Sequence, residues 1–482
     1  MPLSLPVRVR PAALCAVSLL LARAAAAQTP TPTPLPQDRF TLQARANVVQ
    51  GSGARALGMG GAFLARADDA TAASWNPAGL SYLRLPEVSF VYSGGSLNSR
   101  ETVPATGEFI DDRRHGDTPD FLAATYPLQL GPVSGSMQLS FQRQISFASF
   151  RTIDEFFVPS AVDTEPFTRR STITSRGGFD VLALGSGWQL TRTLRAGATL
   201  NRWFQGYEQT YDKPLEQGVS HQEVAFDFHG WNANFGLIWT PTEALNLGMI
   251  YKTGFRGDYF LRRFRRDPFA NEEGFRERSV NNDDVRVVED DLGVHQRLFR
   301  LHFPDAVGVG ASLRPRSAVT VSVDYTRTGW SHGTVENFFD LGRTGDPSIF
   351  PELPYPTLNG VVPQEDTEQL RAGLEYVVIA GRWKVPLRVG YFSDRQYFRA
   401  LQREATLADG SVIQVTRAPR FDAVTAGAGI ILGRVLLDVA YVYEHGRYID
   451  LVPSEDGVKT THAIRVTSSR VYVSVNYRHT HR

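Results

Sequence analysis

Five charged residues lie in segments of the sequence where apolar and polar residues alternate, and they are the first candidates for binding chemistry. They are Asp324, Arg371, Glu375, Arg388 and Asp438. A guanidinium group matches a carboxylate in bidentate geometry, so Arg371 or Arg388 could hold the carboxylate of a ligand. The alternative is a polar network in which the five groups pair with one another. The sequence leaves both interpretations open.

Patterns for catalysis and for metal binding are weaker. The sequence contains neither a G-x-S-x-G nucleophile turn nor a G-x-x-x-x-G-K-[ST] phosphate loop, which argues against a hydrolase and against a nucleotide-driven pump. His479 and His481 could share a strand face, but no third metal ligand lies near them in the sequence. We therefore expect no enzyme activity, no cofactor and no metal site.

The charged candidates lie in segments where apolar and polar residues alternate, which is the pattern of half-buried β-strands. Most of these segments contain roughly ten residues, the length that a tilted strand needs to cross a bilayer. We predict strands at Pro86–Gly94, Asp120–Pro127, Ser134–Gln144, Gly178–Leu190, Thr193–Gly206, Gly230–Thr240, Glu243–Gly254, Asp305–Arg314, Ser317–Thr328, Glu368–Ile379, Lys384–Ser393, Phe421–Ile431, Arg434–Glu444 and Val466–Arg478.

The connections between these segments alternate in length along the whole chain. Connections of two to six residues follow connections of more than twenty residues without exception. Outer-membrane barrels have short turns on one side of the membrane and long loops on the other, whereas a soluble sandwich has no reason for this order. We predict an all-β fold, a transmembrane antiparallel β-barrel of about 14 strands.

The two faces of each predicted strand differ in polarity. Val471, Val473 and Val475 share one face of the last strand, while Ser474 and Asn476 share the other. In a barrel the apolar face contacts lipid and the polar face lines the lumen. The five charged candidates lie on polar faces, so we expect them inside the barrel.

The overall charge and the N-terminal residues narrow the location of the protein. With 51 basic and 50 acidic side chains, the chain lacks the positive charge that nucleic-acid binding requires. Residues 1–27 combine Arg8 and Arg10 with a short apolar run and with Ala25 and Ala27, which is the pattern of a cleaved signal peptide. Residues 28–39 are rich in Pro and Thr and are predicted to be a stiff linker.

Residues 40–85 precede the first predicted strand and are rich in small residues. They contain Gly-Met-Gly-Gly-Ala-Phe at 58–63, Ala-Asp-Asp-Ala-Thr at 67–71 and Asn-Pro-Ala-Gly-Leu at 76–80. Small residues allow close backbone packing, so this segment could fill the lumen as a plug, with residues 86–482 forming the barrel. Gly58, Gly60, Gly61 and Phe63 are the candidate packing residues of this plug.

These motifs resemble the FadL family of outer-membrane transporters for long-chain fatty acids and other hydrophobic compounds. The resemblance continues in Phe-Pro-Asp-Ala-Val-Gly-Val-Gly at 303–310 and in Leu-Arg-Ala-Gly-Leu-Glu-Tyr at 370–376. It implies a fourteen-stranded barrel with an N-terminal hatch, and release of ligand through a gap beside a kinked strand, here Ser134–Gln144. The family motif implicated in hatch function corresponds to Asn76, Pro77 and Ala78, followed by Gly79.

The resemblance implies passive, hatch-gated uptake of a hydrophobic small molecule across the bacterial outer membrane, with a fatty acid as the default ligand. We expect a monomer in contact with membrane lipid and lipopolysaccharide. The alternative is an interaction barrel like the PorV shuttle proteins of a secretion system, which also share the glycine-rich run and bind cargo proteins at their loops. A charged stretch between strands is expected to be a solvated extracellular loop, with calcium or lipopolysaccharide contact as the alternatives; its residues are Arg262, Arg263, Arg265, Arg266, Asp283, Asp284, Glu289, Asp290 and Asp291.

Overall fold

The computed structural model describes most of the chain that follows the predicted linker. The described ranges are 51–157, 166–215, 218–267, 297–332, 335–337, 365–381, 383–406, 412–453 and 459–479. The predicted signal peptide, the predicted linker, residues 40–50, the acidic stretch 283–291 and His481 lie outside these ranges. Within the described ranges, no helix is both long and apolar enough to span a membrane.

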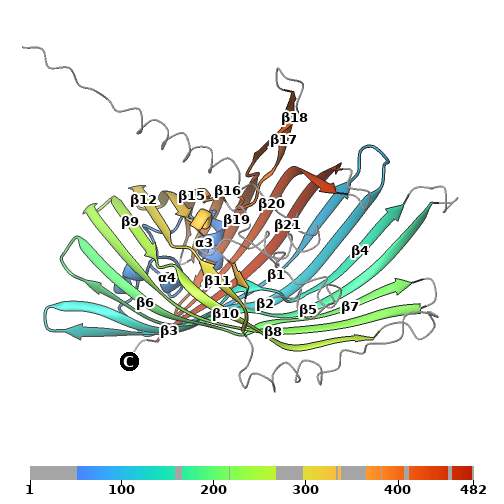
Figure 1. The fold of residues 1–482 in the computed structure, drawn as a ribbon. Helices are drawn as coiled ribbons and strands as arrows, with labels where there is room; N and C mark the ends of the chain where they lie inside the picture. The colour runs from blue at the N-terminus through green and yellow to red at the C-terminus, as the bar shows by residue number, and fades with distance from the viewer. Residues whose placement is uncertain are drawn as a thin grey trace, which may run out of the picture.

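Fourteen strands pair antiparallel in one ring, which closes where the first strand pairs with the last (Figure 1). In ring order they are β1 (Glu87–Thr102), β2 (Phe109–Leu130), β3 (Val133–Ser146), β5 (Phe167–Gln189), β6 (Leu194–Phe204), β8 (Gly218–Thr242), β9 (Leu245–Lys252), β12 (Ala306–Arg316), β13 (Val319–Thr328), β15 (Thr367–Ala380), β16 (Trp383–Arg395), β19 (Arg420–Leu432), β20 (Val435–Pro453) and β21 (Lys459–Arg478). The predicted all-β barrel is therefore confirmed, with a wall strand at each of the predicted segments.

Shorter strands extend the wall at one rim. They are β4 (Ser149–Phe157), β7 (Gly206–Leu215), β10 (Phe255–Asp267), β11 (Arg297–Phe303), β14 (Val335–Asn337), β17 (Ala400–Thr406) and β18 (Val412–Arg417). Figure 1 shows β17 and β18 as a hairpin that projects from this rim.

The long connections of the sequence prediction are in large part strand, which corrects that prediction. β1 runs on to Thr102 and β2 begins at Phe109, so only a short turn separates them. These extensions carry charged residues on both faces, such as the exposed Arg113 beside the half-buried Arg114. Because they are held by backbone pairing rather than by an apolar face, the alternation that identifies a strand in sequence is missing there.

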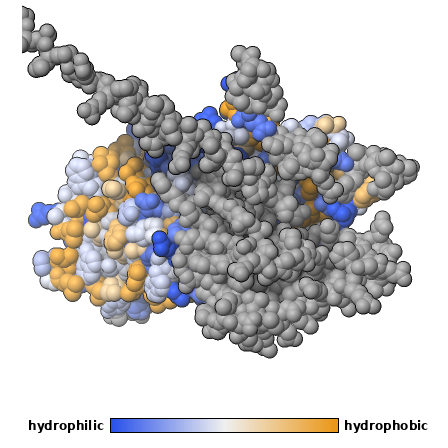
Figure 2. Space-filling view, in the orientation of Figure 1, coloured by the Kyte–Doolittle hydropathy of each residue, from blue (hydrophilic) through white to orange (hydrophobic). Residues whose placement is uncertain are grey.

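The alternation of side chains sorts the wall into an apolar outside and a polar inside. On β21, the side chains of Val471 and Val473 are exposed, at 43% and 41%. The alternate residues Tyr472 and Ser474 are buried, at 4% and 1%. Figure 2 shows apolar residues, in orange, gathered over the outer surface on the left-hand side of the view. The outer apolar surface and the polar lumenal face are both as expected for a wall in lipid.

Residues 51–85 lie within the ring of strands, and we call them the hatch segment. They form α3 (Ala54–Gly58), α4 (Ala72–Trp75) and the 3-10 helix η1 (Pro77–Tyr82), drawn in blue in Figure 1; a further 3-10 turn, η2 (Trp330–His332), follows β13. α3 packs against β16, β19, β20 and β21, and η1 packs against β3, β5, β6 and β8. The hatch segment therefore contacts the wall on opposite sides of the lumen.

Candidate functional site

The hatch segment is tied to the wall by a carboxylate on β13. Oδ2 of Asp324 accepts hydrogen bonds from the backbone nitrogens of Phe63 at 2.6 Å and Leu64 at 2.8 Å. Asp324 is only 1% exposed, so these two bonds form away from bulk water. Because one oxygen of a buried side chain accepts from two successive backbone nitrogens, Asp324 is a principal anchor of the hatch segment.

Asn76 joins the hatch segment to itself and to the wall. Its side-chain nitrogen donates to the carbonyl of Leu64 at 2.8 Å and to the carbonyl of Leu237 on β8 at 3.1 Å. Its side-chain oxygen accepts from the backbone nitrogen of Ala78 at 3.1 Å, which caps η1. Pro77 occupies the first position of η1, where its missing N–H has no cost. The Asn-Pro-Ala run is thus a cap that also bonds to the barrel.

Two glycines are required by close backbone contacts of the hatch segment. A Cβ on Gly79 would lie 1.7 Å from the carbonyl oxygen of Ala67, so no larger residue fits. Gly60 has a φ of +67°, and its Cβ would lie 2.8 Å from backbone atoms of Ala372 and Tyr391 on the wall. These contacts explain why the glycine-rich runs pack so closely in the lumen.

The other predicted packing residues lie in the same interface. Gly58 faces Gly427 of β19, where an added Cβ would lie 3.1 Å from the Gly427 Cα. Gly61 lies against Trp75, whose ring meets Phe63 edge to face with centroids 6.2 Å apart. Phe63 and Trp75 are both buried, so this pair forms the apolar centre of the hatch segment.

Arg388 lies between two wall carboxylates. Its Nε is 2.7 Å from Oε2 of Glu375 on β15, and its Nη1 is 2.6 Å from Oδ1 of Asp438 on β20. The Arg388 side chain is 1% exposed. Both ends of the Arg388 guanidinium are therefore held by wall residues. This is the arrangement expected of a polar network rather than of a free site for a ligand carboxylate.

Arg371 is placed differently. Its Nη2 donates to Oε1 of Gln369 at 2.7 Å, and its guanidinium lies 5.5 Å from the ring centroid of Trp75. Its Nε and Nη1 are buried and find no hydrogen-bond partner within the described part of the chain. Arg371 therefore keeps donors that could bind a ligand carboxylate, but they lie beneath the hatch residues Gly61 and Trp75.

Ion pairs also join the hatch segment to the wall and join parts of the hatch segment to each other. Arg66 places Nη2 2.8 Å from Oε1 of Glu375, and Arg55 places Nη1 2.7 Å from Oδ1 of Asp68. Burial alone would raise the pKa of the Asp68 carboxyl, but Arg55 and Arg66 outweigh this effect and hold that pKa below its ordinary value. Asp68 is therefore ionised at neutral pH and holds Arg55 within the hatch segment.

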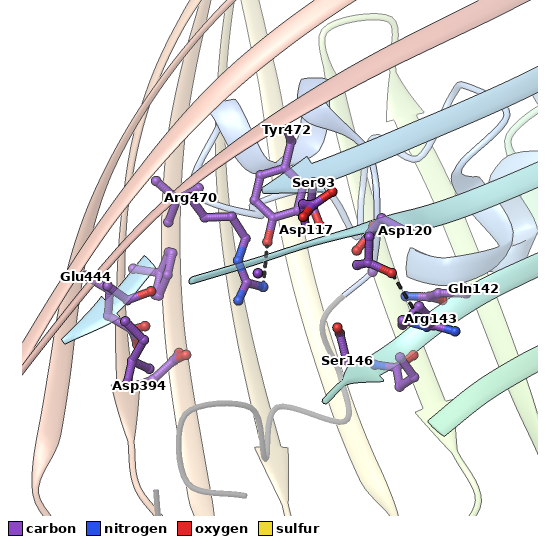
Figure 3. Close-up of a pocket in the computed structure, with 18 residues that line it drawn as sticks. Ser93, Asp117, Asp120, Gln142, Arg143, Ser146, Asp394, Glu444, Arg470 and Tyr472 are labelled. Carbon is purple, nitrogen blue, oxygen red and sulfur yellow. Dashed lines mark hydrogen bonds between the residues drawn. The ribbon is translucent and has the colours of Figure 1, made fainter. Parts of the chain in front are cut away.

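A cavity that opens to solvent lies between the start of the hatch segment and the wall, and together with the adjoining open space it measures about 950 Å³ (Figure 3). Its lining includes Gly51 of the hatch and residues of β1, β2, β3, β16, β20 and β21. Figure 3 shows charged side chains from several strands around this space; those labelled on the lumenal face are Asp120, Arg143, Asp394, Glu444 and Arg470, whereas Asp117 bonds to Tyr92 on the outer face. The sequence analysis did not single out these residues, although their inward position follows from strand alternation once the register is known.

The ladder between β2 and β3 is interrupted beside this cavity. β2 pairs with β3 only as far as Phe121 opposite Gln142, and it next pairs with β4 from His115 opposite Phe150. β3 has a bulge at this level, where its register against β5 shifts between Arg143 and Ile145. The irregularity lies in the strand that the family resemblance identifies as the kinked one.

Polar side chains bridge the interruption. Arg143 of β3 donates to Oγ1 of Thr118 on β2 at 3.0 Å and forms a bidentate pair with Asp180 on β5, each bond 2.8 Å long. A smaller cavity of about 420 Å³ adjoins the first and shares Gln142 and Gln144 of β3 with it. Both spaces therefore border the irregular part of β3.

Comparisons with known proteins identify the fold. No family model and no curated protein sequence matches the chain. Among solved structures, a FadL homologue of Pseudomonas aeruginosa has 12% sequence identity and a TM-score of 0.54 over 89% of this chain and 98% of that one. The toluene transporter TodX of P. putida has 14% identity and a TM-score of 0.52 over 90% and 100%.

The toluene transporter TbuX of Ralstonia pickettii is similar to the same extent, with 12% identity and a TM-score of 0.50 over 90% of this chain and 99% of that one. The likenesses span nearly the whole of each of these chains. At these low identities the likeness concerns the fold: the chain has the closed fourteen-stranded barrel fold of the FadL homologue and of the two toluene transporters.

Proposed function

We propose that this protein is a channel of the bacterial outer membrane that takes up hydrophobic small molecules. The apolar outer surface of the wall, the predicted signal peptide at residues 1–27 and the fold shared with a FadL homologue and two toluene transporters support this location and role. The wall contacts membrane lipid and lipopolysaccharide, and the protein acts as a monomer without catalysis.

The interruption between β2 and β3 is the observation that carries the proposal. It lies beside the larger cavity, so a ligand in the cavity is next to the stretch of β2 that pairs with neither β3 nor β4 within the described wall. A hydrophobic ligand would leave sideways into the membrane here, while the hatch segment blocks the direct path along the barrel axis. Movement into lipid is downhill, because each methylene removed from water contributes about 0.8 kcal/mol.

The hatch segment is the gate in this scheme. Its anchors are the Asp324 carboxylate and the Asn76 carboxamide, which hold adjoining parts of the segment to β13 and β8. A ligand that displaces either contact would shift the hatch segment relative to the wall. Asn76, Pro77, Ala78 and Gly79 are therefore the proposed gating residues, and the Gly58–Phe63 run provides the packing surface.

Equilibrium binding and uptake of labelled hydrophobic compounds test this function. The ligands are a long-chain fatty acid and toluene, and the proteins are the full-length barrel, Asn76→Ala and the control Asn98→Ala, which changes an exposed asparagine on β1. Saturable, competable binding and an uptake rate altered only by Asn76→Ala support the proposal. Lack of binding by a folded, heat-modifiable barrel contradicts the proposal and favours the shuttle alternative. Capture of partner proteins that bind the loops would then test that alternative.

A further inference from the structure

Asp324 and Arg371 lie directly opposite each other on neighbouring strands, yet their side chains are not paired. The register of β13 and β15 places one residue against the other, and both side chains are buried on the lumenal face, at 1% and 3% exposed. Residues directly opposite each other in an antiparallel ladder have Cβ atoms about 4.5–5.5 Å apart, which is within reach of an ion pair. Asp324 bonds instead to the hatch segment, and Arg371 bonds to Gln369 of its own strand.

The Asp324 carboxyl group is turned away from Arg371. Its Oδ2 accepts from the hatch amides of Phe63 and Leu64. Its Oδ1 leans toward β12, where a Cβ added to Gly310 would lie 2.2 Å from this atom. Oδ1 has no hydrogen-bond partner within the described part of the chain. Because β12 and β15 flank β13 on opposite sides, the docked carboxyl group occupies the side away from Arg371.

The Arg371 guanidinium lies under the hatch segment and has unused donors. Its Nη2 donates to Gln369, while its Nε and Nη1 have no acceptor among the described residues. A Cβ added to Gly61 would lie 3.4 Å from Nη1, and the guanidinium lies 5.5 Å from the ring centroid of Trp75. A buried polar group without a partner is destabilising, and the docked hatch segment leaves such groups on both Arg371 and Asp324.

Undocking of the hatch segment would remove the amides from which Asp324 accepts. A buried carboxylate without donors is strongly disfavoured, so a wall that offered no replacement would resist undocking. Arg371 offers a replacement, because its planar guanidinium matches a carboxylate in bidentate geometry. The backbone ladder already holds the two residues opposite each other, so rotation of their side chains is sufficient to form the pair.

We propose that Arg371 is the second partner of Asp324: when the hatch segment undocks, the Asp324 carboxylate exchanges the amides of Phe63 and Leu64 for the Arg371 guanidinium. This inference rests on the proposed function, in which the hatch segment is the gate, and it names the residue that stabilises the open state. The wall itself supplies the replacement bond. An uncharged hydrophobic ligand can therefore open the gate, since it need not bring a polar group to Asp324.

Hydrogen exchange at the amides of Phe63 and Leu64 tests the inference, because these amides exchange when the hatch segment undocks. The full-length barrel is measured at pH 8, where a carboxyl group paired with an arginine is ionised. Arg371→Met removes the partner of the undocked state, so we expect exchange about tenfold slower, the factor for one hydrogen bond to a charged group. If Arg371 only supports the docked hatch segment through Trp75, Arg371→Met accelerates exchange and the inference is overturned.

A double-mutant cycle separates the proposed pair from the loss of the unused Arg371 donors in the docked state. The effect of Arg371→Met is compared with and without Asp324→Asn, so that the separate effect of Asp324→Asn cancels. We expect the slowing by Arg371→Met to shrink severalfold in the Asp324→Asn background, because a carboxamide carries no charge. Slowing of the same size in both backgrounds assigns the effect to the docked state and overturns the inference.

The matched control is Arg316→Met, which removes an exposed arginine at the end of β12 and should leave exchange unchanged. Slowing by this control equal to that by Arg371→Met also overturns the inference. If neither Arg371→Met nor the shorter Arg371→Gln folds, the resting state depends on Arg371 and the inference is wrong. Uptake of toluene by the unsubstituted barrel is measured in parallel. Absence of uptake contradicts the proposed function, whereas the exchange rates decide the inference about Arg371.

Discussion

The backbone nitrogen of Phe63 lies 2.6 Å from Oδ2 of Asp324, so the wall holds the hatch segment by its main chain. The same oxygen accepts from the next amide, that of Leu64. This contact does not depend on which side chains the hatch presents, only on the path of its backbone. The path in turn depends on the glycines that precede Phe63.

Asp324→Asn should loosen the hatch segment while the barrel stays folded. The substitution replaces one carboxyl oxygen by a donating NH2 group that cannot accept from a backbone nitrogen, and a typical hydrogen bond contributes about 0.5–1.5 kcal/mol. We expect faster hydrogen exchange at the amides of residues 63 and 64 and more frequent current openings in planar bilayers. Ser322→Ala, on the same lumenal face of β13, is the control. Unchanged exchange at both amides would refute the anchoring role of Asp324.

Gly60→Ala should destabilise the protein more than Gly381→Ala does. Both glycines have positive φ, +67° and +60°, so both substitutions carry a backbone cost of about 1–2 kcal/mol. Only at Gly60 would the new Cβ lie 2.8 Å from wall backbone, because nothing lies within 4 Å of the Cβ position at Gly381. The temperature at which the folded band converts in heat-modifiability gels measures the difference. Equal shifts for the two variants would show that the close contact of Gly60 has no cost.

Deletion of Gln144 should impair ligand exit without abolishing ligand binding. Removing this residue takes out the bulge, so β3 would pair with β5 in continuous register through Arg143 and Ile145. A straighter β3 lies closer to β2 and narrows the interruption. Uptake by cells, normalised to the amount of folded barrel, should fall severalfold, while binding to the purified protein persists. The control is Gln144→Ala, which keeps the bulge and should transport normally. If the deletion variant takes up ligand as fast as this control, the sideways route is wrong.

Acid should loosen the hatch segment through Asp68. Its pKa in the folded hatch segment is below the ordinary value of 3.8, so the ionised form favours the folded arrangement with Arg55 and Arg66. This contribution is present above the ordinary pKa and is lost as the pH falls through the lowered pKa. Hydrogen exchange over residues 54–68 should be faster in Asp68→Asn than in the unsubstituted protein at pH 7, and the difference should shrink as the pH falls through the lowered pKa. A difference that does not shrink in acid would assign the effect to another group.

The wall could be predicted from the sequence because lipid imposes a pattern on it. An apolar residue at every second position, as at Val471, Val473 and Val475, is required only where a strand has one face in an apolar medium. The rim extensions have no face in lipid, so their sequences need not alternate. The residues around Arg113 lack this alternation, and the sequence therefore did not predict that the strands continue through them. Strand existence was therefore predictable from the sequence, and strand length was not.

The candidate site was predictable only in part, for a different reason. The Asn76–Gly79 run stands out because its residues are local in sequence and cap one turn. Asp394 and Glu444 meet in one cavity from β16 and β20, and their proximity depends on strand register and on ring closure. Likewise, the charged residues around Arg388 were identified, but the specific pairing of Arg388 with Glu375 and Asp438 needed the structure.

The seam between β1 and β21 has a consequence for biogenesis. The ring closes only when the last strand of the chain pairs with the first, from Glu87 opposite Arg478 onward. Ser474 on this last strand also bonds to Ala54 of the hatch segment. A nascent chain that stops before β21 lacks both the seam and this hatch contact. One strand at the end of the chain is thus needed both to close the wall and to complete this contact of the hatch segment.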